Sequence, residues 1–87
     1  MASIPNIRFT KHSLIQCNER GTNKEEVIEA IKTGSKKPAK HGRTMFSANF
    51  AYNKLWNKTF YAIKQVAVVV SIEENEIVVI TVYTFYF

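Results

Sequence analysis

The stretch VAVVVSIEENEIVVITVYTFYF, residues 66–87, is the most apolar part of the chain and predicts a two-stranded hairpin. Two runs rich in Val, Ile, Thr, Tyr and Phe flank a polar tetrad at residues 73–76. Such runs are typical of strands, and a short polar interruption is typical of the turn between them. We therefore expect a β-sheet centred on this hairpin, with the rest of the chain packed around it.

The register of this hairpin decides which side chains share a face of the sheet. A turn centred on Glu74 and Asn75 predicts these cross-strand partners: Lys64 with Phe85, Val66 with Tyr83, and Val68 with Thr81. Because side chains alternate between faces along a strand, this register places Lys64, Thr81 and Tyr83 on one face. A loop that is one residue longer or shorter would move Lys64 to the other face.

Two short helices are predicted before residue 35. Thr10 can cap the first, over residues 11–20, because its hydroxyl can accept a hydrogen bond from a backbone N–H of the first turn. Thr22 or Asn23 can cap the second, over residues 24–33, which has glutamates in its first turn where the helix dipole favours negative charge. A glycine follows each helix, as is typical of helix ends.

Before the helices, residues 6–9 are predicted as an edge strand or an extended lead-in, and after them residues 35–44 as a polar loop or the frayed start of a strand. Residues 45–52 are predicted as a strand with one aromatic face, followed at 53–58 by a turn with an exposed or rim tryptophan. Strands are predicted at 59–64 and 66–72, and these two could be continuous. Helices followed by strands indicate an α+β fold. We expect a single domain over residues 1–87, in which two N-terminal helices pack on a twisted antiparallel sheet of three to five strands.

Basic residues are concentrated in the N-terminal half of the chain. Residues 1–43 contain nine Lys or Arg and four Glu, whereas residues 44–87 contain three of each sign. The net charge of +5, with no Asp in the sequence, indicates either a polyanionic partner such as nucleic acid or simply a basic soluble surface. A single cysteine, Cys17, and the lack of an export signal or a long apolar segment favour a cytoplasmic protein that does not enter a membrane.

Several classes of active site lack their residues in this sequence. His12, His41 and Cys17 are the soft metal ligands, and their spacing does not match a zinc site. The glycines form no phosphate-binding loop, and without Asp there is no Ser-His-Asp triad. The sequence therefore predicts neither a metal nor a cofactor.

RNA strand cleavage is a reaction that the available side chains can perform without a metal. It needs a base for the 2′-hydroxyl, an acid for the 5′-oxygen and positive charge beside the phosphorane, roles that suit His, Lys and Arg. His12 is the candidate acid or base, since an imidazole titrates near ~6.5; the alternative is a solvated histidine at a helix N-terminus. Arg20 either binds the scissile phosphate or pairs with Glu19 or a carboxylate of the sheet.

Further candidates lie on the predicted sheet and in the basic loop, by which we mean residues 36–43 of the predicted polar segment. Thr81 and Tyr83 are polar positions in an apolar strand, so they either belong to the site or pack with their hydroxyls hydrogen-bonded. Lys64 joins them in the register described above and is otherwise a solvated edge residue. The loop carries residues that either follow an RNA backbone, with aromatic residues nearby for base stacking, or are simply solvated: Lys37, Lys40, His41 and Arg43.

Four motifs resemble those of a family of small bacterial domains of unknown function. They are Phe9-Thr10-x-His12-x-Leu14, Glu19-Arg20-Gly21, Glu-Glu-Val-x-x-Ala-Ile-x-x-Gly over residues 25–34, and Val-Ile-Thr-Val-Tyr over residues 79–83. The family pattern is F-T-x-H-A, E-R-G, a second helix and a closing V-I-T-V-Y strand. In this chain Ser13 replaces the usual Ala, and Cys17 replaces a larger apolar residue.

That family resembles the superfamily of barnase, EndoU, colicin-type and RelE-type ribonucleases, whose members include toxins of toxin–antitoxin pairs and of contact-dependent inhibition systems. The resemblance implies a metal-independent endoribonuclease toxin, with tRNA as the favoured substrate, that a cognate immunity protein or antitoxin neutralises. It also implies action in the cytoplasm of a target cell, where some similar domains recruit elongation factor Tu. By position, the resemblance assigns site roles to His12, Arg20, Thr81, Tyr83 and, more loosely, Lys64. The alternative is a non-catalytic RNA- or protein-binding module that uses the same basic face.

Overall fold

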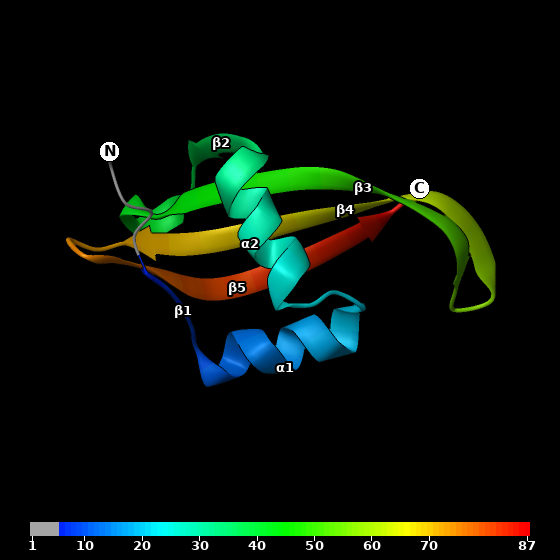
Figure 1. Ribbon diagram of the computed structural model, residues 1–87, viewed down its shortest axis with the longest axis horizontal. Helices are drawn as coiled ribbons and strands as arrows, with labels where there is room; N and C mark the ends of the chain where they lie inside the picture. Colours follow the sequence, from blue (N-terminus) through cyan, green and yellow to red (C-terminus); the bar gives the residue numbers. More distant parts are fainter. Residues whose placement is uncertain (1–5) are drawn as a thin grey trace.

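The predicted C-terminal hairpin is the centre of a five-stranded sheet in the computed structural model, which describes residues 6–87 (Figure 1). In chain order the elements are β1 (Asn6–Phe9), α1 (Lys11–Arg20), α2 (Lys24–Thr33), β2 (Ser35–Pro38), the 3-10 turn η1 (Lys40–Gly42), β3 (Thr44–Trp56), β4 (Thr59–Ile72) and β5 (Glu76–Tyr86). The strands lie in the order β1-β5-β4-β3-β2. The predicted α+β fold is confirmed. We call the sheet face that carries the helices the inner face, and the opposite face the open face.

Both helices begin and end where the sequence predicts. Thr10 Oγ1 accepts a hydrogen bond from Ser13 N (3.1 Å), and Asn23 Oδ1 accepts one from Glu26 N (2.9 Å), so each helix has a side-chain cap. Thr10 Oγ1 also donates to Val79 O (3.1 Å). The first turn of α1 is therefore fixed to β5.

The hydrophobic core lies between the helices and the inner face of the sheet. From α2 it contains Val27, Ala30 and Ile31. From the two central strands it contains a row of fully buried valines: Val66, Val68, Val70, Val79 and Val82. Burial of one such side chain contributes about 1.5–3 kcal/mol, so the hairpin supplies a large part of the free energy that holds the helices in place.

A β-bulge in β5 makes the predicted hairpin register wrong beyond the first pairs. Near the turn the partners are as predicted. Ile80 is then an extra residue in β5, and beyond it the pairing is displaced by one, so that Lys64 pairs with Tyr86. Because an inserted residue reverses the alternation of side chains, Lys64 lies on the inner face, whereas Thr81 and Tyr83 lie on the open face. The prediction that these three residues share a face is wrong.

The hairpin of β3 and β4 is longer than the sequence indicates. Residues 53–56, which are predicted as part of a turn, continue β3, and the turn itself is Asn57 and Lys58. Their φ values of 49° and 71° suit a two-residue hairpin loop. The pairing of β3 with β4 shifts between Ala51 and Lys54, where Tyr52 and Asn53 form a bulge. Beyond this bulge the strand continues to Trp56.

The end of this long hairpin returns to the C-terminal end of α1. Trp56 is half-buried and stacks on Tyr86, with 4.9 Å between the ring centroids, so of the two positions predicted for the tryptophan, exposed or at the rim, the structure shows the second. Gly21 ends α1 with a φ of 75°, and a Cβ atom there would lie 2.7 Å from the Trp56 ring. Only glycine fits both this backbone conformation and this space.

The outer edge of β5 is shared by β1 and α1 (Figure 1). β1 pairs with β5 in parallel, so the sheet is mixed, although its other pairs are antiparallel as predicted. At the other side of the sheet β2 pairs with β3, so the segment predicted as a loop or frayed start of a strand begins with a true edge strand. None of the helices in the described part of the chain is long and apolar enough to cross a membrane.

Candidate functional site

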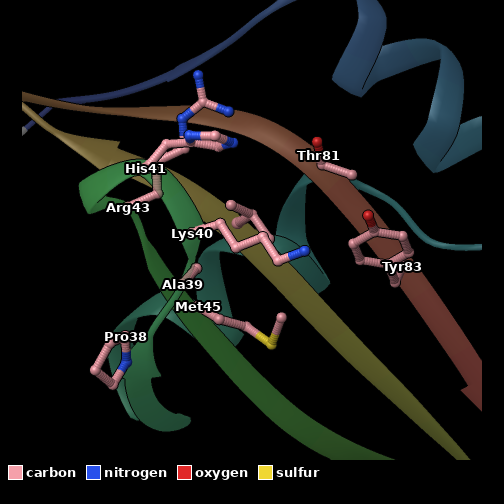
Figure 2. A pocket seen from close by; sticks show the side chains of 9 residues that line it. Pro38, Ala39, Lys40, His41, Arg43, Met45, Thr81 and Tyr83 are labelled. Carbon is pink, nitrogen blue, oxygen red and sulfur yellow. The ribbon is translucent and has the colours of Figure 1, made fainter.

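The basic loop and two residues of β5 surround a hollow on the open face of the sheet (Figure 2). Its volume is about 710 Å³, which is in the range of ligand pockets in proteins. The lining residues are Pro38, Ala39, Lys40, His41, Arg43, Met45, Val69, Thr81 and Tyr83. This first pocket joins three of the predicted substrate-binding residues of the loop to two of the predicted catalytic residues of the last strand.

Backbone hydrogen bonds hold the loop after β2 in a closed turn. Ala39 N donates to Arg43 O (2.8 Å), and Arg43 N donates to Lys40 O (3.3 Å). His41 adopts a left-handed conformation with φ of 62°, which lets the chain reverse within η1. The side chains of Lys40, His41 and Arg43 are thereby held around the first pocket (Figure 2).

Thr81 and Tyr83 reach the first pocket because the bulge at Ile80 turns them to the open face. Tyr83 is 39% exposed, and the guanidinium carbon of Arg20 lies 5.3 Å from the centre of its ring. A cation placed over an aromatic ring is attracted to it, so Arg20 restrains the orientation of Tyr83. One extra residue in a strand thus places a hydroxyl and a phenol in the same pocket as the cations of the loop.

A second pocket, of about 490 Å³, adjoins the first on the open face. Met45 and Tyr83 line both pockets, so the two lie side by side. The other lining residues of the second pocket are Lys37, Ser47, Gln65, Ala67 and Phe85. Lys37, the fourth predicted substrate-binding residue, therefore lies beside the second pocket rather than the first.

Among the residues of the second pocket, only Lys37 and Tyr83 are predicted from the sequence as site residues. Gln65 and Phe85 are cross-strand partners, and this pairing depends on the bulge in β5, which the sequence does not mark. The sequence gives one indication of this pocket. Side chains in β3 alternate between the two faces of the sheet, which places Met45 and Ser47 together on the face opposite the aromatic residues of that strand.

Polar side chains of α1 occupy the free edge of β5. Gln16 Oε1 accepts a hydrogen bond from Val82 N (2.9 Å), and Arg20 Nη1 donates to Val82 O (2.5 Å). The carbonyl of Arg20 accepts hydrogen bonds from the hydroxyls of Thr84 (2.8 Å) and Tyr86 (2.7 Å). These contacts close an edge that would otherwise be open to another strand. Arg20 therefore has a structural role as well as a position beside the first pocket.

His12 lies on the same stripe of α1 as Gln16 and Arg20, and its side chain is exposed. Because Gln16 and Arg20 contact β5, this stripe faces the edge of that strand. His12 lines neither of the two pockets, whereas His41 lines the first. The structure thus places one histidine in the first pocket and the other on α1, at the edge of β5.

Lys64 is separated from the other predicted site residues by the sheet itself. It is 6% exposed on the inner face, where its Nζ lies 2.7 Å from Glu26 Oε1 and donates to Gly21 O (2.8 Å). Its ammonium group also lies 5.4 Å from the centre of the Tyr52 ring. These contacts fix the connection between the helices to β4, so Lys64 holds the fold together on the side away from the pockets.

The pockets offer imidazole, ammonium, guanidinium, hydroxyl and amide groups, and no carboxylate lines either of them. Among residues 6–87 no cluster of three or more His, Cys, Asp or Glu side chains is arranged to hold a metal ion. Cys17 is buried in the core, and this burial raises the pKa of its thiol above the ordinary value of 9.0. A neutral, buried thiol is a poor nucleophile, so Cys17 is part of the packing.

The fold and the pockets together define a small α+β domain with helices on one face of the sheet and a basic, partly aromatic groove on the other. The chain belongs to the family described as "Domain of unknown function (DUF4258)", whose model matches residues 9–84. The matched region contains α1 and α2 and every lining residue of both pockets except Phe85. No curated protein and no solved structure matches the chain.

Proposed function

We propose that this protein is a metal-independent endoribonuclease that binds its RNA substrate on the open face of the sheet. The observation that carries the proposal is the first pocket, which is lined both by His41, Lys40 and Arg43 and by Thr81 and Tyr83. An imidazole can transfer protons near neutral pH, and cations stabilise the charge of a phosphorane. Without a carboxylate in its lining, the pocket does not repel a phosphate.

In the proposed reaction the 2′-hydroxyl of the substrate attacks the adjacent phosphorus while a base removes its proton. The bond from phosphorus to the 5′-oxygen breaks, and an acid protonates that oxygen, which leaves a 2′,3′-cyclic phosphate and a 5′-hydroxyl. We assign one proton transfer to His41 and the phosphorane contacts to Lys40 and Arg43. His12 is the candidate for the other proton transfer, because its stripe of α1 faces β5.

The resemblance to toxin ribonucleases extends the proposal to a biological role. On this proposal the substrate is tRNA, and the cleavage harms the cell in which it occurs. A cognate immunity protein or antitoxin would then neutralise the activity. As a delivered toxin domain the protein would act in the cytoplasm of a target cell, with elongation factor Tu as a further partner.

A non-catalytic RNA-binding module is the second candidate. The exposed rings of Tyr83 and Phe85 on the open face favour it, because base stacking on aromatic rings holds RNA without any proton transfer.

Digestion of total RNA in the presence of EDTA separates the two candidates. The endoribonuclease cleaves RNA under these conditions, and His41→Ala slows cleavage by about 10²- to 10⁴-fold while RNA binding remains. His12→Ala tests the second proton transfer in the same assay. Lys40→Ala weakens binding, whereas Lys32→Ala, at an exposed position of α2 away from the pockets, is the matched control. RNA that the unaltered protein binds but never cleaves would refute the enzyme and support the binding module.

A further inference from the structure

The second pocket has features that the proposed cleavage chemistry does not use. Neither histidine lines it, yet it lies beside the first pocket, with which it shares Met45 and Tyr83. A strand with its scissile phosphate in the first pocket can therefore place a neighbouring nucleotide in the second. The volume of about 490 Å³ is in the range of small-molecule sites.

Two aromatic rings project into this part of the open face. Tyr83 and Phe85 are 39% and 47% exposed, and their ring centroids lie 6.5 Å apart with 23° between the ring planes. Neither ring belongs to the hydrophobic core. Large aromatic side chains that remain exposed and nearly parallel offer a stacking surface for planar rings, and every nucleobase has such a face.

Polar groups lie beside the aromatic rings within the same pocket. Gln65 is half-buried on β4 opposite Phe85, and Ser47 lies on the neighbouring strand β3. A glutamine amide presents a donor and an acceptor side by side, and a serine hydroxyl can serve as either. This combination can bind the hydrogen-bonding edge of a base that stacks on the aromatic rings.

The charges around the pocket select an anionic occupant. Lys37 lies at the second pocket, two further cations line the first, and no carboxylate lines either. In a duplex, the bases are stacked on one another and paired, so they cannot enter a side pocket, whereas the bases of a single strand can. The occupant that fits both the charge and the aromatic rings is a single-stranded nucleic acid.

We infer that the second pocket is a subsite for one unpaired nucleobase of the RNA strand, which stacks on Phe85 and Tyr83 and is selected through hydrogen bonds to Gln65. The inference rests on the proposed function for the identity of the ligand as RNA. It adds the requirement that the substrate is single-stranded at this position, and it assigns base preference to a residue outside the cleavage chemistry.

Binding of 2′-O-methyl RNA hexamers, measured by fluorescence anisotropy in EDTA, tests this subsite. These probes lack the attacking hydroxyl, so binding is measured without cleavage. We compare hexamers of A, C and U, single-stranded and annealed to their complements, with each protein checked for an unchanged thermal midpoint. Phe85→Ala weakens binding of all single strands by about 5- to 100-fold. Gln65→Ala reduces the differences among the three bases, and the duplexes bind more weakly than the strands.

Two exposed positions away from the pockets provide matched controls. Phe60→Ala, on the β3–β4 hairpin, removes an aromatic ring, and Asn18→Ala, on α1, removes an amide; neither changes the binding. Binding by Phe85→Ala equal to that of the unaltered protein, or base preferences unchanged by Gln65→Ala, would overturn the subsite.

The failure of this inference is distinguishable from failure of the proposed enzyme. If RNA is cleaved in EDTA but Gln65→Ala leaves the base preference intact, the subsite is refuted and the endoribonuclease stands. If no RNA is cleaved but Phe85→Ala and Gln65→Ala change hexamer binding as expected, the subsite is supported in a protein that only binds RNA.

Discussion

Lys64 is buried on the inner face, where the Glu26 carboxylate and the Gly21 carbonyl hold its ammonium group. Both partners of the ion pair are largely withdrawn from water, with side chains 8% and 22% exposed. Loss of one member of such a pair leaves the other charge without its partner in a poorly solvated place. Lys64 therefore contributes mainly to the stability of the folded protein.

Lys64→Met is expected to lower the free energy of unfolding by about 3–5 kcal/mol, because it leaves the Glu26 carboxylate without its positively charged partner. The double variant Lys64→Met with Glu26→Gln recovers part of this loss, since no unpaired charge remains. Urea denaturation at neutral pH measures both effects. If a folded Lys64→Met protein lost all RNA cleavage, or the double variant were no more stable than the single one, this account of Lys64 would be wrong.

Cys17 gives the stability of the fold a dependence on alkaline pH. Burial raises the pKa of its thiol, so the thiol ionises more readily in the unfolded chain than in the folded one. The stability that this neutral thiol contributes is complete below the ordinary pKa of 9.0 and is lost as the pH rises through the raised pKa of the folded state.

Cys17→Ala is expected to be less stable at neutral pH because a buried sulfur is removed, but to lose less stability than the unaltered protein as the pH rises from 7 to 10. Urea midpoints across this range give the comparison. Burial also raises the pKa of Tyr86, but Tyr86 is present in both proteins. The difference between the two curves therefore reports the contribution of Cys17 alone. Parallel curves for the two proteins would contradict the assignment.

At the scale of elements, α1 acts as a cap on the edge of the sheet. β1 pairs with β5 only as far as Val79. Further along the same edge, the side chains of Gln16 and Arg20 form hydrogen bonds with the backbone N–H and C=O of Val82. The helix therefore hydrogen-bonds to β5 where another strand would otherwise pair. This arrangement explains why Gln16 is buried although glutamine usually lies at the surface.

Gln16→Leu is expected to cost about 1–3 kcal/mol, because it leaves the Val82 N–H buried without an acceptor. Native-state hydrogen exchange should show a faster rate at the Val82 amide than in the unaltered protein. Glu19→Ala, at an exposed position of the same helix, is the control and leaves that rate unchanged. An equally slow Val82 amide in Gln16→Leu would show that the helix does not protect this edge.

Helix positions were predictable from sequence, whereas the face of each strand residue was predictable only in part. Thr10 and Asn23 are local caps, so the helix boundaries depend on a few neighbouring residues. The bulge at Ile80 lies in a run of β-branched residues without Gly or Pro, and nothing in that run marks where alternation reverses. The faces of Lys64 and Tyr83 depend on that one position.

At the scale of the whole molecule, the two faces of the sheet carry different groups of residues. The inner face carries the core and the buried ion pair, whereas the open face carries the pockets, whose lining is free of carboxylates. The basic loop and the last strand could be singled out from composition and motif. The cross-strand pairing of Gln65 with Phe85 could not be predicted from the sequence, because it depends on a register of β4 and β5 that forms only with the complete sheet.

The most direct test of the central claim, that RNA binds on the open face, is to map the contact by NMR with a single-stranded 2′-O-methyl hexamer. The claim predicts that the side-chain amide of Gln65 and the methyl group of Met45 change their chemical shifts as RNA is added. The side-chain amide of Asn23 and the methyl groups of Ile28, which belong to the helical side, should not change. Shifts confined to the helical side, with Gln65 and Met45 unaffected, would contradict the account.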